Sequence, residues 1–161
     1  MPAYDHSSQV AELTSRIAAI RYAMFTTIDQ HGHLVSCPMT NQHTDPEGNL
    51  WFFTSTVSPL WEQIAAHPQV NLSFVDPERS IYVSVNGQAE RVVDRARIKG
   101  LWNTEAQAWF PDGPDDLHAM LVCVRSQTAE YWDAKVNAMV ELFKVLTGGK
   151  PEDGKHGHLD L

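Results

Sequence analysis

Four hydroxyl side chains follow a strongly apolar segment and are the residues best placed to bind a ligand. They are Thr54, Ser55, Thr56 and Ser58, and Pro59 comes directly after them. Hydroxyls and successive backbone N–H groups at a helix N-terminus bind anions, helped by about half a unit of positive charge from the helix dipole. A structural role explains the same residues, because Ser58 can cap a helix and threonines suit the end of a strand. The residues themselves leave both interpretations open.

The other reactive residue types show weaker patterns. The eight histidines form no HExxH motif. His31 and His33 flank a turn glycine, and His156 and His158 lie in the C-terminal tail, so exposed side chains are expected there and no metal site is predicted. Cys37 lies in an expected strand with no neighbouring cation or base to activate its thiol, so we expect it to be buried and inert.

An aromatic group in the C-terminal half has two interpretations. It consists of Trp102, Trp109, Phe110 and Trp132, with Trp51 and Trp61 earlier in the chain. Such rings could line the pocket of a flat cofactor. They are equally suited to a core or a dimer interface, because large rings dominate burial energetics.

Composition narrows the class of protein. The chain has 161 residues, 43% hydrophobic and 20% charged, which is typical of a globular protein and predicts one domain over 1–161. A formal net charge of −8 argues against nucleic acid and anionic membranes as partners. No apolar run approaches the ~20 residues that span a bilayer, and the N-terminus lacks signal-peptide features. Two distant cysteines, Cys37 and Cys123, favour a reducing cytoplasm.

The elements that position the hydroxyls can be read from local patterns. We expect an N-terminal helix within residues 1–20, with Ser7 or Ser8 as its cap, and a hairpin of strands 22–29 and 34–40 with Gly32 at the turn. A strand at 50–54 should lead into a helix that Ser58 caps and that ends near His67.

The second half alternates in the same way. The expected elements are strands at 69–76 and 80–94 with a bulge at Gly87, a helix from Thr104 to about Phe110 opened by a capping box, and strands at 117–126 and 128–133. A helix at about 134–147 and a polar tail at 148–161 follow, and the tail is expected to be loose except at its end. Six or seven short strands with tight turns predict a mainly β protein, an antiparallel β-barrel with peripheral helices.

Several segments, taken in order, resemble a known family. The chain is similar to the pyridoxamine 5′-phosphate oxidase-like split barrels, and within them to the general stress protein 26 group. The resemblance rests on AMFTTIDQHGHLVSCPM, GNLWFFTSTVSPLWEQIAAHPQVNLSFVD, YVSVNGQAERVVD, LWNTEAQAWFPDGPDD and AEYWD, with the ending HGHLDL. It implies a six-stranded antiparallel split β-barrel that forms a homodimer with two flavin sites at the subunit interface.

The resemblance also implies the cofactor and its residues. The cofactor is FMN, or FAD, and the implied binding residues are Ser36, Cys37, Pro38, Met39, Phe53, Thr54, Ser55, Ser58, Leu60, Trp102, Trp109 and Trp132. The resemblance implies that Ser36, Pro38 and Met39 lie along the cofactor. It implies that Phe53, Thr54 and Ser58 form the wall and the phosphate turn, and the tryptophans match those that recur in the group.

Two positions depart from the group's pattern. Cys37 stands where the group has arginine in S-R-P-M, and Leu60 stands where it has lysine in S-P-K or S-x-K. Each lost charge-assisted hydrogen bond removes roughly 1.5–3 kcal/mol. FMN affinity should therefore fall by about 10²- to 10⁴-fold, unless Arg21, Arg97 or Lys99 substitutes.

Three functions remain open at this point. The first is a flavin-binding stress protein, which, if it is an enzyme, is an FMN-dependent oxidoreductase; no catalytic residue can be named. The second is a non-catalytic dimeric binding module that holds another small apolar ligand at the interface. The third is a purely structural dimer.

Overall fold

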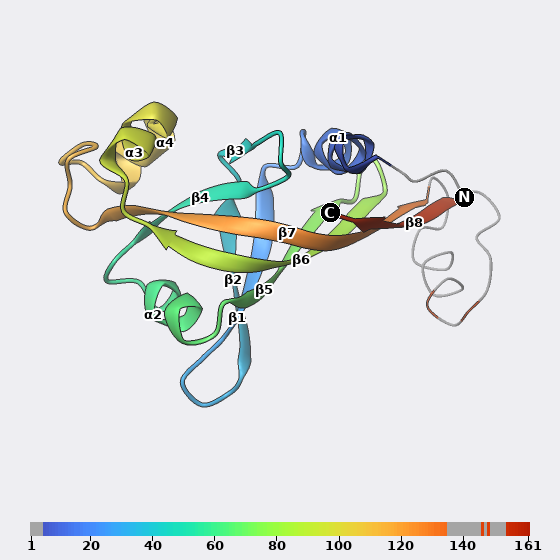
Figure 1. The fold of residues 1–161 in the computed structure, drawn as a ribbon, viewed down its shortest axis with the longest axis horizontal. Helices are drawn as coiled ribbons and strands as arrows, with labels where there is room; N and C mark the ends of the chain where they lie inside the picture. Colours follow the sequence, from blue (N-terminus) through green and yellow to red (C-terminus); the bar gives the residue numbers. More distant parts are fainter. Residues whose placement is uncertain (1–4, 135–145, 147, 149–153) are drawn as a thin grey trace.

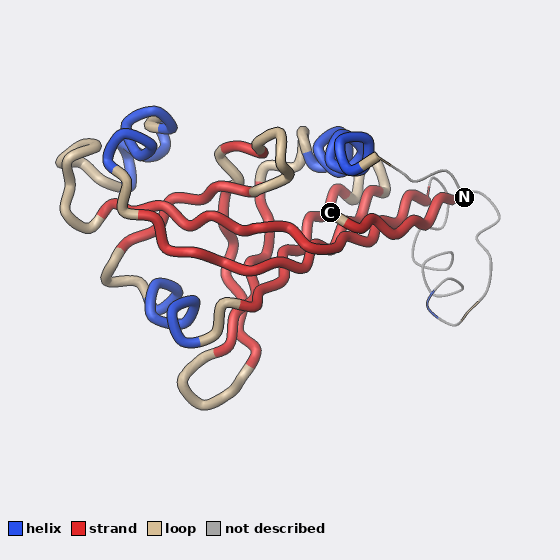
Figure 2. The backbone as a smooth tube through the Cα atoms, viewed as in Figure 1, coloured by secondary structure: helices blue, strands red, loops and turns tan. Residues whose placement is uncertain are grey.

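The computed structural model describes residues 5–134, 146, 148 and 154–161. These residues form one antiparallel sheet that curls into a half-barrel, with short helices around its rim (Figures 1 and 2). The helices are α1 (His6–Ile17), α2 (Pro59–Ala66), α3 (Arg95–Leu101) and α4 (Thr104–Trp109). The strands are β1 (Tyr22–Ile28), β2 (Leu34–Thr40), β3 (His43–Thr44), β4 (Leu50–Ser55), β5 (Gln69–Asp76), β6 (Ile81–Val92), β7 (Ala119–Ala134) and β8 (Gly154–Asp160).

The strand order is β2-β1-β5-β6-β7-β4-β3, and β8 pairs with the free part of β7. All the pairings are antiparallel. Without the two-residue β3 and the C-terminal β8, six longer strands remain, so the predicted mainly β split barrel is confirmed. The sheet is open, because β2 at one end of this order does not pair with β4 near the other end.

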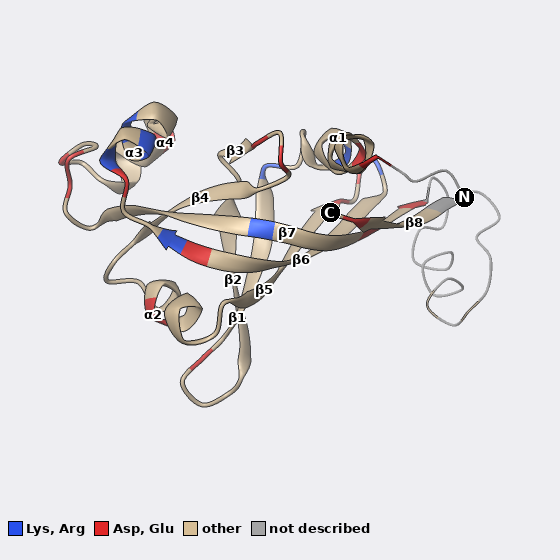
Figure 3. Cartoon of the chain, in the orientation of Figure 1, with Lys and Arg blue, Asp and Glu red and all other residues tan. Residues whose placement is uncertain are grey.

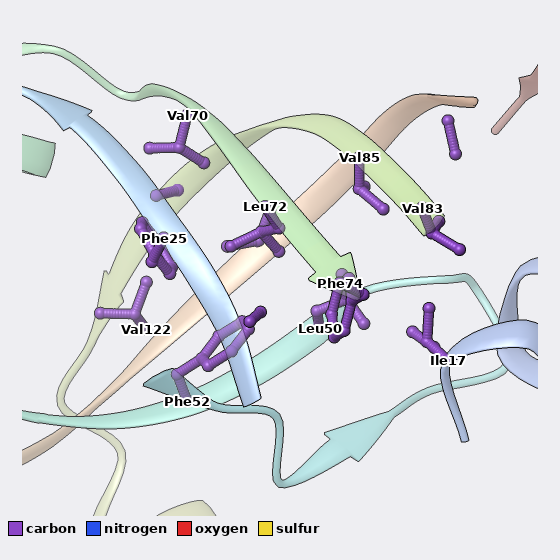
Figure 4. Close-up of a cluster of buried hydrophobic side chains, with 14 of the residues drawn as sticks. Ile17, Phe25, Leu50, Phe52, Val70, Leu72, Phe74, Val83, Val85 and Val122 are labelled. Atoms are coloured by element: carbon purple, nitrogen blue, oxygen red, sulfur yellow. The ribbon is translucent and has the colours of Figure 1, made fainter. Parts of the chain in front are cut away.

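The core lies on the concave side of the sheet, and alternation along the strands puts it there. Ten of its apolar side chains converge in Figure 4: Ile17, Phe25, Leu50, Phe52, Val70, Leu72, Phe74, Val83, Val85 and Val122. Phe25 and Phe52 meet edge to face with ring centroids 5.3 Å apart. Each such side chain stabilises the fold by roughly 1.5–3 kcal/mol. The helices contribute to this core, because Ile17 of α1 and Leu60 of α2 are buried in it.

Helix caps agree with the sequence at one helix and shift at two. Ser58 caps α2 and Pro59 is its first residue, as predicted. Asp5, and not Ser7 or Ser8, caps α1, which ends at Ile17. Asn103 caps α4 in place of Thr104. The side chain of Gln107 bonds to Trp102 and Pro111, so it does not close the predicted capping box.

The two strands predicted at 117–126 and 128–133 are one strand, β7. The register jumps from Gly87 opposite Ser126 to Asn86 opposite Thr128, so Gln127 is an extra residue on β7. The bulge predicted at Gly87 is therefore confirmed, and it explains why the β7 pattern looked interrupted. A side chain at Gly87 would collide with the backbone of Arg125, so the close approach requires glycine.

Three short elements were not predicted from the sequence. The sequence patterns missed α3 and β3, and the tail predicted to be loose contains β8. The helix predicted at 134–147 falls almost entirely outside the described residues. Within the described ranges, no helix is long and apolar enough to cross a membrane.

Candidate functional site

The split between β2 and β4 brings the two implied binding segments together. Gln42 donates its backbone N–H to the Trp51 carbonyl, and the Asn41 side chain accepts from the Trp51 N–H, so the strands meet at this end. Beyond it, within the described chain, no ladder joins β2 to residues 52–55. The split is therefore bordered by two strand edges with backbone groups free of ladder partners.

The β2 side of the split is small and uncharged. Ser36 and Pro38 are exposed on the outer face, whereas Cys37 and Met39 pack against the core. Burial raises the pKa of the Cys37 thiol, so this side chain is neutral at physiological pH. The predicted inert cysteine is half-buried, and it supplies no charge to the split.

The hydroxyl turn bonds to itself. Ser55 Oγ accepts from the Val57 N–H at 3.3 Å, and Ser58 Oγ accepts from the Leu60 N–H at 3.2 Å. The Thr56 hydroxyl lies 2.7 Å from His118 Nδ1 across the β4–β7 ladder. The helix-cap interpretation of Ser58 is thus confirmed, and the Ser55 and Thr56 side chains also take part in local bonds.

Leu60 points away from the turn and into the barrel. It is 4% exposed and belongs to the same core as Phe25 and Phe52. Ionised lysine is almost never buried without a partner. A lysine here would have to leave the core to reach an anion outside it.

A second apolar cluster covers the outer face of β4 under α3 and α4. Phe53 lies in it, with its ring 5.5 Å from that of Trp102 and edge to face. Trp102 in turn lies beside Phe110, whereas Trp109 is exposed. Phe53 and Trp102 therefore act as packing residues in this chain, and their predicted contact with a cofactor stays a prediction.

Trp132 lies far from this cluster. Phe53 pairs with Leu121, and the extended stretch 121–132 of β7 spans roughly 36 Å. The Trp132 ring stacks on His156 of β8 at a centroid distance of 5.4 Å, and its indole N–H is buried without a partner among the described residues. Within one chain, Trp132 and the hydroxyl turn cannot contact the same small ligand.

The three substitute cations named from the sequence are already paired. Arg21 binds Glu105, Arg97 Nε lies 3.9 Å from Asp94, and Lys99 Nζ lies 3.3 Å from Asp115. β2, β4 and the turn into α2 contain no charged residue (Figure 3). The borders of the split are therefore electrically neutral.

Sequence reasoning missed a row of side chains on the outer face of the sheet. The outer row consists of Tyr22, Val75, Tyr82, Trp132 and His156. The last four are register partners across β5, β6, β7 and β8, and Tyr22 lies on β1 one residue beyond the pair of Ala23 with Phe74. Tyr22 is 57% exposed and Val75 is 48% exposed. Alternation within each strand predicts that these residues face away from the core. It does not predict that they lie side by side, because that depends on the order in which the five strands pair.

The histidines do not form a metal centre. His31 and His33 are exposed at the β1–β2 turn, as predicted. His156 and His158, predicted in a loose tail, lie on β8, 3.5 and 3.7 Å from the carboxylate of Glu130. Among the residues with described positions, no group of three or more potential ligands could hold a metal ion.

Comparison with known proteins gives one consistent result. A family model described as pyridoxamine 5′-phosphate oxidase like matches residues 8–152. The protein bli-3 of Neurospora crassa is 29% identical over 156 residues, covering 89% of this chain and 75% of its own length.

Two solved structures share the fold. A protein related to general stress protein 26, from Clostridium acetobutylicum, has a TM-score of 0.73 at 18% identity, covering 98% of this chain and 96% of its own. The general stress FMN/FAD binding protein from Xanthomonas citri has a TM-score of 0.68 at 24% identity, covering 81% and 92% respectively.

Proposed function

This chain belongs to the pyridoxamine 5′-phosphate oxidase-like family, and from that premise we propose that it is a homodimer that binds the ring system of a flavin in the split between β2 and β4. The similar Xanthomonas citri structure is described as FMN/FAD binding, which supports the ligand class.

The observation that carries the proposal is the open split itself. Its two borders offer backbone N–H and C=O groups that no ladder among the described residues uses, beside the apolar side chain of Met39. A flavin ring is flat and largely apolar, with hydrogen-bonding atoms along one edge. Ligand pockets have this combination of apolar walls and a few directed polar groups.

The second subunit is proposed from the outer row. Its apolar and aromatic side chains lie on the four strands β1, β5, β6 and β7, and soluble chains seldom leave such a surface uncovered. A second copy of the chain, packed on this face, would bury Tyr22, Val75 and Tyr82. It would also bring a Trp132 to the site from the partner, which the length of β7 forbids within one chain.

An oxidoreductase activity is the finer part of the proposal. A bound flavin supplies hydride and electron transfer. The contribution of this chain would be to hold the ring at the split and to shield it from water with apolar side chains. An acid or base for a substrate is not assigned.

A flavin titration tests the proposal. The purified chain should quench the fluorescence of micromolar FMN or riboflavin. AMP, an anionic nucleotide that lacks the flavin ring, should not displace either flavin. A chain that leaves the fluorescence of both flavins unchanged at a hundred micromolar protein would refute flavin binding.

A second candidate is a dimeric module for another apolar ligand, as the resemblance also allowed. The neutral Cys37 and the core-facing Leu60 favour it, since both make the split less suited to an anion. An apolar dye that binds the chain and is not displaced by any flavin would support this candidate over the first.

A further inference from the structure

We propose that the flavin site of this chain does not recognise the phosphate group, so that riboflavin and FMN bind with nearly equal affinity. The inference rests on the flavin-binding function proposed above and adds to it the class of flavin that the site selects. It follows from the contacts of the turn between β4 and α2, and from the cations near the split.

The backbone donors of the turn are used within the chain. Helix N-termini bind phosphate through N–H groups that lack an intrahelical partner. Here the Val57 N–H bonds to Ser55 Oγ, the Ser58 N–H bonds to the Ser55 carbonyl at 2.9 Å, and the Leu60 N–H bonds to Ser58 Oγ. Pro59 has no N–H to offer.

Thr56, at the start of the turn, is also hydrogen-bonded within the chain. The Thr56 N–H bonds to the His118 carbonyl at 3.0 Å, and the Thr56 hydroxyl bonds to the ring of the same histidine. These bonds extend the β4–β7 ladder past Ser55, which pairs with Ala119. A phosphate would have to replace bonds that the folded chain already makes.

Positions 37 and 60, which carry cations in the general stress protein 26 pattern, supply no charge to a phosphate in this chain. Leu60 is buried in the barrel core, and the Cys37 thiol is neutral and half-buried. Both side chains fill space on the inner side of the split. Leu60 could not be replaced by a charged residue without a rearrangement of the core, and Cys37 as it stands supplies no charge.

The three cations named from the sequence as substitutes have carboxylate partners. Arg21 pairs with Glu105, Arg97 with Asp94 and Lys99 with Asp115. The net charge of −8 adds a repulsive background for a phosphate dianion. The structure thus offers a ring-binding split next to a turn whose backbone N–H donors are engaged and which contains no cation.

The direct test compares two flavins that differ only in the phosphate. The dissociation constants of FMN and riboflavin should be measured by fluorescence quenching at low and high salt. We expect a ratio within about threefold and little salt dependence, whereas a site with two charge-assisted contacts would favour FMN by about 10²- to 10⁴-fold.

The outcomes separate the two proposals. An FMN preference above thirtyfold that falls with added salt would overturn the present inference and leave flavin binding intact. If neither flavin binds, the proposed function fails and this inference fails with it. Equal affinities support both.

A charge placed on the turn gives an independent test. Val57 is 76% exposed, so Val57→Lys adds an ammonium group without disturbing the core, unlike Leu60→Lys. It should tighten FMN by about tenfold and leave riboflavin unchanged. Leu146→Lys, at a residue 69% exposed, is the charge-matched control and should change neither. Equal effects of Val57→Lys on both flavins would overturn the inference.

Discussion

The hydroxyl turn at residues 54–58 and the outer row on the sheet differ in a way that their compositions do not suggest. The turn is rich in polar groups, yet the N–H groups of Thr56, Val57 and Ser58 bond to its own oxygens or to His118. The outer row is largely apolar, yet Tyr22 and Val75 are exposed to solvent. A polar segment is therefore not a binding site when its groups are already satisfied, and an apolar one becomes a binding surface when nothing covers it.

The largest expected effect comes from a charge on the outer row. Val75→Glu would bury an unpaired carboxylate in the proposed dimer interface, which costs several kcal/mol and should weaken the dimer by on the order of 10²- to 10³-fold. Sedimentation velocity would measure the change. The matched variant Val57→Glu changes an exposed valine of the turn and should leave the dimer intact. If Val57→Glu weakened the dimer as much as Val75→Glu, the outer row would not be the dimer interface.

A second prediction concerns the strand that completes the outer row. A side chain at Gly157 would overlap the Tyr131 ring, so Gly157→Ala should destabilise the chain by about 1–3 kcal/mol through overpacking. Urea unfolding would report the change. At Gly100 in α3 there is open space, so Gly100→Ala should stabilise by about 0.5–1 kcal/mol. Stabilisation by Gly157→Ala would mean that β8 does not cross Tyr131 as described.

A third prediction concerns Asp45 in the turn between β3 and β4. Burial acts to raise the pKa of Asp45, but hydrogen bonds from Trp51 Nε1 and from Asn49 outweigh it and lower the pKa. Asp45 thus stabilises the fold above its unfolded pKa of about 3.9, and this contribution is lost as the pH falls through the lower folded value.

Asp45→Asn should accordingly cost about 1.5–2 kcal/mol at pH 7, and the difference from the parent chain should shrink towards pH 2. Urea unfolding at both pH values measures it. Asp112→Asn, at an exposed loop position, is the control and should have little effect at either pH. A difference that grows on acidification would contradict the assigned hydrogen bonds.

The smallest effect distinguishes a cap from a ligand site. Ser58→Ala removes the cap of α2 and should cost about 1 kcal/mol of stability. Because the account gives Ser58 a structural role, FMN affinity should change by less than about twofold in the folded protein. Loss of FMN affinity with riboflavin binding unchanged would restore the turn as a phosphate site.

Local signals in the sequence were sufficient for much of the fold. Strand β5 was predicted at its observed bounds, because Val70, Leu72 and Phe74 alternate without interruption. The start of α2 followed from Ser58-Pro59 alone. Helix α3 was missed because it is short and buries only Ile98, so no helical period could be recognised.

The site was predictable only in part, since it depends on contacts between distant residues. The partner of Arg21 is Glu105, 84 positions away, and nothing in the sequence links them. The direction of Leu60 likewise depends on how α2 packs on the sheet. The outer row needs five strands in register, which alternation within each strand cannot supply.

The central claim, a flavin held between two copies of the chain, is tested most directly by sedimentation velocity recorded at 450 nm. The account predicts that the flavin signal sediments at twice the 18.1 kDa mass of the chain. It also predicts that this signal returns to the free ligand in Val75→Glu. Flavin that sediments with the monomer, or that stays bound when Val75→Glu has separated the subunits, would contradict the claim.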